Sequence, residues 1–124
     1  MLILLIFFTL NVKSQNQTMQ NGIYLMEYNS PTKNSNKLVL RDSLYVLYTE
    51  NDTISNRIFW ISKRKFILKD CYNTELGKTL TNSFGDICYE ITDIKNGRFS
   101  FKPYYTGQLH ITLTDGIFVP LNLK

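Results

Sequence analysis

Residues 86–105 read DICYEITDIKNGRFSFKPYY, and this stretch decides the fold class. On both sides of Asn96-Gly97 the apolar residues alternate with polar ones, which is typical of β-strands with one buried face. A type I′ turn requires positive φ at both central residues, and Asn and Gly tolerate that conformation. The stretch therefore predicts an antiparallel hairpin with strands over 86–94 and 98–105.

The chain around this hairpin consists of similar short runs separated by turn residues. Further strands are predicted over 23–28, 37–41, 44–48, 54–61, 65–72, 108–113 and 117–121. Residues 73–85 are expected to form a loop, in which 75–80 make one helical turn. Pro103 and Pro120 have no N–H to donate, so they belong at strand ends, edges or bulges.

Short links favour antiparallel pairing between strands that follow one another in the chain. The sequence thus predicts an all-β fold, an antiparallel up-and-down meander of about eight strands. A long meander exposes two edges unless it curls, so we expect a small closed or half-closed barrel. Residues 22–124 form one domain, and no internal repeat is present.

The first 14 residues have the features of a secretory signal peptide. Leu2–Phe8 is an unbroken apolar run, too short to span a bilayer as a helix. Val12 and Ser14 are small enough for cleavage after Ser14, although no Lys or Arg precedes the apolar run. We expect a secreted or periplasmic protein with a flexible mature N-terminus over 15–21; a buried N-terminal strand is the alternative.

Two cysteines, Cys71 and Cys88, are expected to pair in an oxidising compartment. Setting Cys71 opposite Cys88 also places Lys69 opposite Glu90 and Ile67 opposite Thr92 across an antiparallel pair. This register puts both thiols on the outward face and the apolar residues on the other. The prediction is an outward-facing disulfide that closes the 73–85 loop.

No catalytic, metal-binding or cofactor-binding pattern is recognised in the sequence. The single histidine, His110, alternates with Leu109 and Ile111 and is expected to face solvent. A lone His does not make a typical zinc site, and the acidic residues lie mostly at turns. Phosphate-binding and nucleophile motifs are missing. We therefore expect a protein that is not an enzyme and takes no cofactor.

A basic cluster, Lys63-Arg64-Lys65 with Lys69, lies beside Trp60 and Phe66. Cations next to aromatic residues on a small barrel are one pattern for binding single-stranded nucleic acid. A solvated hairpin turn that protects two hydrophobic strands from aggregation explains the cluster better. The predicted export argues against nucleic acid, and cleavage, which removes Lys13, would lower the formal net charge from +4 to only about +3. We expect no nucleic-acid partner.

Aromatic residues are numerous, with eight Tyr, eight Phe and one Trp. Tyr combines an apolar ring with a hydroxyl that needs a polar partner or water, so some of these residues suit a ligand-binding or partner-binding face. The candidates are Tyr24, Tyr45, Trp60, Tyr89, Tyr104 and Tyr105. Packing in the core is the plainer explanation for most of them.

Three short motifs resemble a group of short exported bacterial proteins of unknown function. They are Asn21-Gly22-Ile23-Tyr24, Arg41-Asp42-Ser43, and Trp60-Ile61-Ser62 followed by Phe66-Ile67-Leu68. The resemblance implies a lipocalin-like or related small barrel and brings no active site with it. The cysteine that this group has near its mature N-terminus has no counterpart here.

The leading functional hypothesis is a non-catalytic exported binding module, and the ligand expected for it is a small apolar molecule. The alternative is a structural or protein-interaction domain of the cell envelope with a filled core. A cavity smaller than about 300 Å³ would favour this alternative. An integral membrane protein is not expected.

Overall fold

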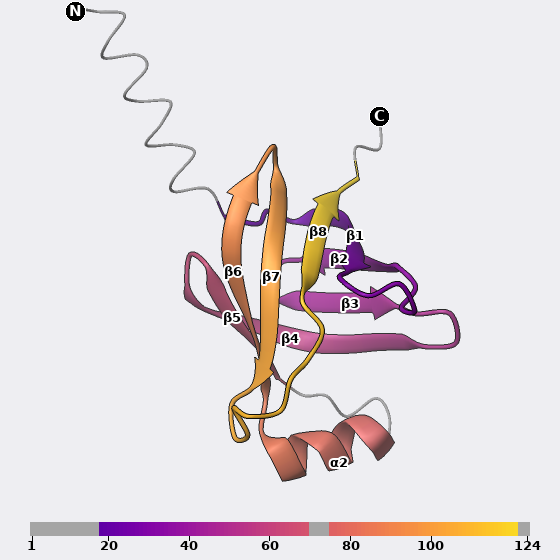
Figure 1. Cartoon of the computed structure of the whole chain (residues 1–124), viewed down its shortest axis with the longest axis vertical. Coiled ribbons are helices and arrows are strands. Elements are labelled where there is room, and N and C mark those ends of the chain that lie inside the picture. The colour runs from indigo at the N-terminus through magenta and orange to yellow at the C-terminus, as the bar shows by residue number, and fades with distance from the viewer. Residues whose placement is uncertain (1–17, 70–74, 122–124) are drawn as a thin grey trace, which may run out of the picture.

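A computed structural model describes residues 18–69 and 75–121 of the chain. In these residues eight β-strands form a closed antiparallel barrel in sequence order, and one α-helix lies at one end of it (Figure 1). The predicted all-β meander is confirmed, and the barrel is closed. The predicted signal peptide, residues 1–14, lies outside the described residues.

The barrel closes because the first strand pairs with both the second and the last. The elements are β1 (Gly22–Tyr28), β2 (Asn36–Arg41), β3 (Leu44–Tyr48), β4 (Thr53–Ser62), β5 (Lys65–Lys69), α2 (Glu75–Phe84), β6 (Ile87–Lys95), β7 (Arg98–Tyr105) and β8 (Gly116–Pro120). β1 pairs with β8 over five residue pairs, from Tyr24 opposite Pro120 to Tyr28 opposite Gly116. Closure leaves no long exposed sheet edge.

The predicted turns that connect neighbouring strands are present. Asn96 and Gly97 have φ angles of 54° and 75°, as a type I′ turn between β6 and β7 requires. Asp42, at the turn between β2 and β3, also has a positive φ of 57°. Pro103 lies beyond the three residues of β7 that pair with β8, and Pro120 ends β8.

The predicted strand over 108–113 is wrong. Residues 109–110 form a turn and 111–113 are irregular, with one isolated bridge between Tyr105 and Gln108. β8 pairs with Phe99–Phe101 near the start of β7, so the chain must return along β7 before β8 begins. A strand beside the end of β7 would also meet Pro103, which has no N–H to donate. Leu109 is consequently 71% exposed.

The predicted register between β5 and β6 is wrong by four residues. Lys65 lies opposite Glu90, and Ile67 lies opposite Cys88 instead of Thr92. An even shift leaves every side chain on its predicted face, because the period of a strand is two residues. Phe66 and Tyr89 therefore still face the core, as predicted.

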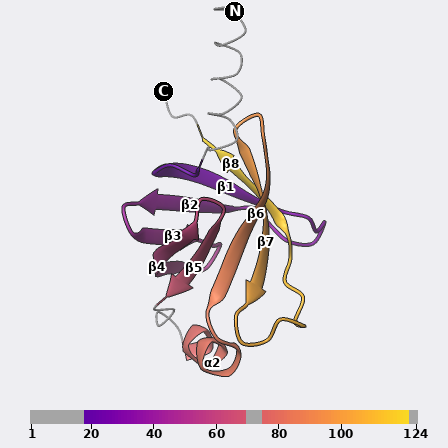
Figure 2. The ribbon, with the colours of Figure 1, turned by 90° about the vertical axis from the view of Figure 1, so that its left-hand side faces the viewer.

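Residues 75–84, expected to be mainly loop, form helix α2. Glu75 lies in its first turn, where a negative charge favours the helix dipole. Gly85 follows the last turn with a φ of 84°, and its N–H donates to the Thr81 carbonyl at 2.9 Å. Figure 2 shows α2 below one end of the barrel. Within the described parts of the chain, no helix has the length and hydropathy to cross a membrane.

Aromatic rings fill most of the barrel interior. Phe66 and Tyr89 stack with their centroids 5.2 Å apart, and Phe101 and Phe118 lie 4.3 Å apart. Met19 precedes β1, within the segment expected to be flexible, and it is buried in the same core with 6% exposure. The interior is therefore largely occupied by the protein's own side chains.

Candidate functional site

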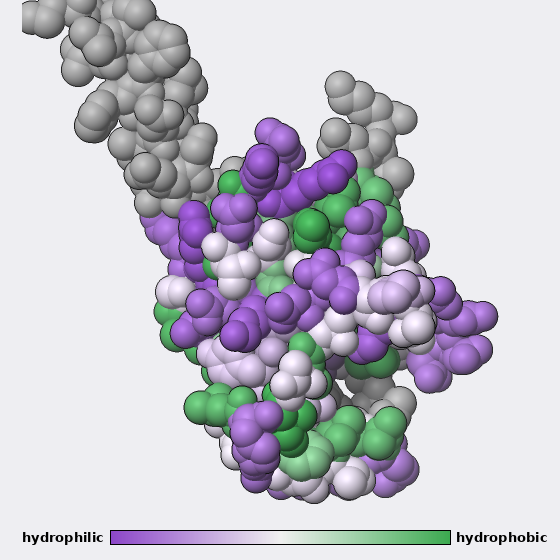
Figure 3. All heavy atoms as spheres, viewed as in Figure 1, coloured by the Kyte–Doolittle hydropathy of each residue, from purple (hydrophilic) through white to green (hydrophobic). Residues whose placement is uncertain are grey.

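An apolar cavity of about 210 Å³ remains at the end of the barrel where α2 lies. Side chains from five strands, β3 to β7, and from α2 surround it: Tyr45, Leu47, Ile54, Asn56, Leu68, Leu76, Leu80, Thr81, Ile87, Tyr89 and Tyr105. Nearly all of these contribute apolar atoms. Figure 3 shows hydrophobic side chains gathered at this end of the molecule.

Helix α2 supplies one wall of the cavity. Leu76, Leu80 and Thr81 line it, and no residue of the helix is fully buried. The helix is thus packed less tightly on the barrel than the strands are on one another. Since elements with few buried contacts open at low cost, α2 is the wall that can move when a molecule enters.

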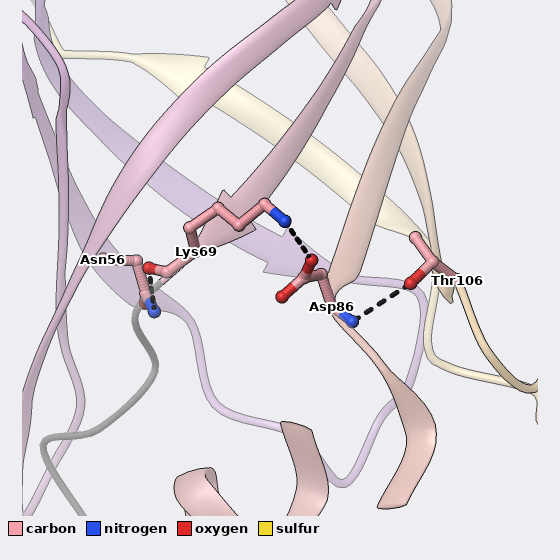
Figure 4. Close-up of polar contacts among 4 residues, drawn as sticks. All are labelled: Asn56, Lys69, Asp86 and Thr106. Atoms are coloured by element: carbon pink, nitrogen blue, oxygen red, sulfur yellow. Dashed lines mark hydrogen bonds and ion pairs between the residues drawn. The ribbon is translucent and has the colours of Figure 1, made fainter. Parts of the chain in front are cut away.

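A chain of polar contacts connects the strands around the cavity (Figure 4). Asn56, 4% exposed, donates a hydrogen bond to the backbone oxygen of Lys69 at 3.3 Å. The Lys69 ammonium lies 2.7 Å from the Asp86 carboxylate, and the Asp86 N–H donates to the Thr106 hydroxyl at 3.0 Å. These contacts link β4, β5 and the segments next to β6 and β7, so they hold the cavity's rim in place.

Three of the six candidate aromatics meet at this cavity. Tyr45, Tyr89 and Tyr105 all line it and are buried, with exposures of 1%, 9% and 7%. The Tyr45 hydroxyl donates to the sulfur of Met26 at 3.4 Å, deeper in the core. The Tyr105 ring packs on Phe84 at the end of α2, with centroids 5.3 Å apart.

The other three candidate aromatics lie elsewhere. Tyr24 is buried in the core away from α2, and its hydroxyl donates to the Gln20 carbonyl. Trp60 lies near the end of β4 and is 39% exposed. Tyr104 is half-buried on the outer face of β7. The structure therefore gives the six residues several different environments instead of one shared face.

Cys88 has no disulfide partner within residues 18–69 and 75–121; it is 1% exposed and lies on the outer face of β6 between Ile67 and Tyr104. Cys71 lies outside the described residues, so the Cys71–Cys88 disulfide stays a prediction. The register that supported it is wrong, since Ile67 occupies the position opposite Cys88. A thiol count on non-reduced, denatured protein distinguishes the two states.

Contact with Cys88 also alters Tyr104. A side-chain hydrogen bond with Cys88, then burial, raises the pKa of Tyr104 to about 12 from its usual value of 10.0. Burial likewise raises the pKa of Tyr24 and of Tyr28. All three hydroxyls therefore hold their protons more tightly in the folded chain than in the unfolded one.

We expect the free energy of unfolding to fall as the pH rises from about 10 to about 12. Below pH 10 these tyrosines are protonated in both the native and the unfolded state. Above the unfolded-state pKa and below the raised native-state pKa, the unfolded state releases protons that the native state retains. Urea unfolding at successive pH values measures this slope. Tyr104→Phe should make this slope shallower, and an unchanged slope in this variant would contradict the raised pKa of Tyr104.

His110 is exposed, as predicted, although it lies in a turn and not in a strand. In the described segments, no three His, Cys, Asp or Glu residues come close enough together to hold a metal ion. The side chains that line the cavity are mainly those of leucine, isoleucine and tyrosine. This lining therefore suits the binding of an apolar molecule.

The sequence predicted only one helical turn over 75–80 within this wall of the cavity, although a signal for the longer helix exists. Leu76, Leu80 and Phe84 are spaced four residues apart, which places them on one face of a helix. The run is only ten residues long and includes Gly77, so the pattern is weak on its own. No protein-family model, curated protein or solved structure matches the chain.

Proposed function

We propose that this chain is a non-catalytic binding domain for a small apolar molecule, held between α2 and the barrel. The observation that carries the proposal is the apolar cavity of about 210 Å³ in a barrel whose interior is otherwise filled. A dry apolar cavity of roughly 150 Å³ in another protein binds benzene, so this volume is enough for a ring or a short alkyl chain.

The size of the cavity narrows the class of ligand. It is smaller than the roughly 300 Å³ typical of sites for drug-sized molecules, which counts against a carrier of whole lipids and in favour of the filled interaction domain. The proposal is therefore restricted to a ligand small enough for this volume. A ligand of one aromatic ring with a short alkyl substituent fits better. Export, which residues 1–14 predict, would place this domain in the periplasm or outside the cell.

A series of alkylbenzenes tests the proposal by isothermal titration calorimetry. We expect affinity to rise from benzene to about butylbenzene, because each buried methylene contributes about 0.8 kcal/mol. It should then stop rising, because longer chains no longer fit in the cavity. Binding of none of these compounds would refute the proposal and favour the alternative, a filled interaction domain.

Leu80→Trp supplies the blocking variant, because it places a large side chain at the α2 wall of the cavity. We expect it to weaken butylbenzene binding at least tenfold, an effect of about 1.4 kcal/mol. Thr79→Trp is the matched control, since Thr79 is the adjacent, exposed residue of the same helix and does not line the cavity. Equal affinities in the two variants would place the ligand elsewhere.

A further inference from the structure

The β4–β5 hairpin exposes three consecutive large hydrophobic residues. Phe59, Trp60 and Ile61 have exposures of 44%, 39% and 57%. With Ser62, the last residue of β4, and the turn residues Lys63 and Arg64 they form what we call the hairpin tip, residues 59–64, which lies at the left edge of the barrel in Figure 1. Isolated exposed hydrophobic residues are ordinary, but three in a row are not.

The pairing of β4 explains this exposure. The last residue of β4 that pairs with β3 is Arg57, so the tip extends past the end of β3. A bulge between Trp60 and Ser62 then leaves Ile61 without a partner on β5 and changes its direction. Phe59 points outward, whereas Trp60 packs on Phe66 with centroids 4.8 Å apart. The three side chains therefore leave the hairpin in different directions.

The positive charge of the chain is concentrated around this tip. Residues 53–69 contain five Lys or Arg and no Asp or Glu, while the whole chain has a net charge of +4. The residues outside this stretch therefore sum to −1. Lys69 pairs with Asp86 at 2.7 Å and Lys65 lies 4.0 Å from Glu90. Both pairs lie on the barrel side of the tip. Lys63 and Arg64 lie in its turn.

We propose that the hairpin tip docks on the surface of an anionic lipid bilayer. A bilayer interface surrounds an inserted tip, so it covers side chains that point in several directions, which a flat protein surface does not. Trp favours the level of the lipid headgroups, and adjacent Lys and Arg are attracted to anionic lipids while their stems lie along apolar surface. This proposal is independent of the α2 cavity.

Single-stranded nucleic acid fits the tip less well. Bases stack on aromatic faces, but Ile61, the most exposed of the three residues, has no ring. The Trp60 ring is already in contact with Phe66. The combination of an aliphatic residue, aromatic residues and cations on one tip is what a lipid interface recognises.

Trp60 is the only tryptophan in the chain, so its fluorescence reports directly on the tip. The test mixes the full chain with vesicles of phosphatidylcholine containing about 30% phosphatidylglycerol, or none. We expect a blue shift of the Trp60 emission only with the anionic vesicles, and its reversal at about 0.5 M salt. Brominated lipids should quench this emission, since bromine quenches on contact. Quenching is the decisive readout, because the apolar residues 2–8 can attract lipid without the tip.

Variants locate the binding surface. Lys63→Gln with Arg64→Gln should weaken binding to anionic vesicles about 25-fold, or about fivefold for each cation. Ile61→Asp should weaken it by about tenfold or more. The matched controls Lys78→Gln and Leu109→Asp change an exposed lysine on α2 and a leucine that is 71% exposed, and both should bind like the unmodified chain.

Three outcomes would overturn the proposal: no quenching of Trp60 by brominated lipids in anionic vesicles, equal quenching in neutral vesicles, or unchanged quenching in Ile61→Asp. A shift with a thymidine oligonucleotide and none with vesicles would also overturn it, in favour of nucleic acid. Circular dichroism of every variant identifies any loss of fold, and Lys63→Gln with Arg64→Gln, which changes only turn residues, keeps the test valid if Ile61→Asp unfolds.

Discussion

Phe66→Ala should lower the free energy of unfolding by about 3–5 kcal/mol, the usual cost of removing a buried phenylalanine. Phe66 is fully buried, and its ring packs on Trp60 at 4.8 Å, on Tyr89 at 5.2 Å and on Tyr45 at 6.1 Å. Its removal leaves a cavity that these rings from three other strands cannot close without leaving their own contacts. Because small domains are stable by only about 5–15 kcal/mol, the loss is a large part of the total.

Urea unfolding followed by circular dichroism measures this effect, and Phe59→Ala is its matched control. Phe59 lies directly opposite Ile67 on the outer face and is 44% exposed, so we expect its replacement to cost less than about 1 kcal/mol. Equal losses from the two substitutions would contradict the assignment of inner and outer faces. The comparison thereby tests the closed barrel itself.

The β5–β6 pair shows what sequence alternation can and cannot specify. Alternation correctly identified Phe66 and Tyr89 as core residues, but it does not distinguish registers that differ by an even number of residues. Lys65 and Lys69 are four residues apart, as are Asp86 and Glu90. The predicted register matched one lysine with one acid, whereas the observed register brings both lysines to an acid.

The cavity depends on contacts that are remote in the sequence. The Asn96-Gly97 hairpin is local, so turn chemistry alone predicted it correctly. The spacing of Leu76 and Leu80 indicates at most a helical face, and nothing local tells which surface that face meets. Residues 108–113 alternate as a strand does, yet the short β8 takes the place beside β7. Local pattern therefore predicted the barrel, and the position of α2 required the structure.

Gly116→Val should destabilise the chain by about 3 kcal/mol, at the upper end of the usual cost of overpacking. Gly116 begins β8 and pairs with Tyr28 on one side and Phe101 on the other. A Cβ atom there would lie 2.6 Å from the Phe101 ring and still closer to the backbone oxygen of Glu27. The ring can turn aside, but the oxygen belongs to β1, so the two strands must move apart.

Separation of β1 from β8 at Gly116 weakens the closure of the barrel, because β8 is then held mainly by β7. β8 is joined to β7 by only three residue pairs, Phe99–Phe101 with Gly116–Phe118, whereas β6 and β7 pair along almost their full lengths. We expect hydrogen exchange of the β8 amides to accelerate more than that of the β2 and β3 amides, because local opening begins where the fewest contacts must break. Ile117→Val, the conservative change at the next residue, should cost about 1 kcal/mol and leave exchange in β8 nearly unchanged. If Gly116→Val instead accelerates exchange equally in all strands, the chain opens only by global unfolding, and the β7–β8 seam is not its weakest contact.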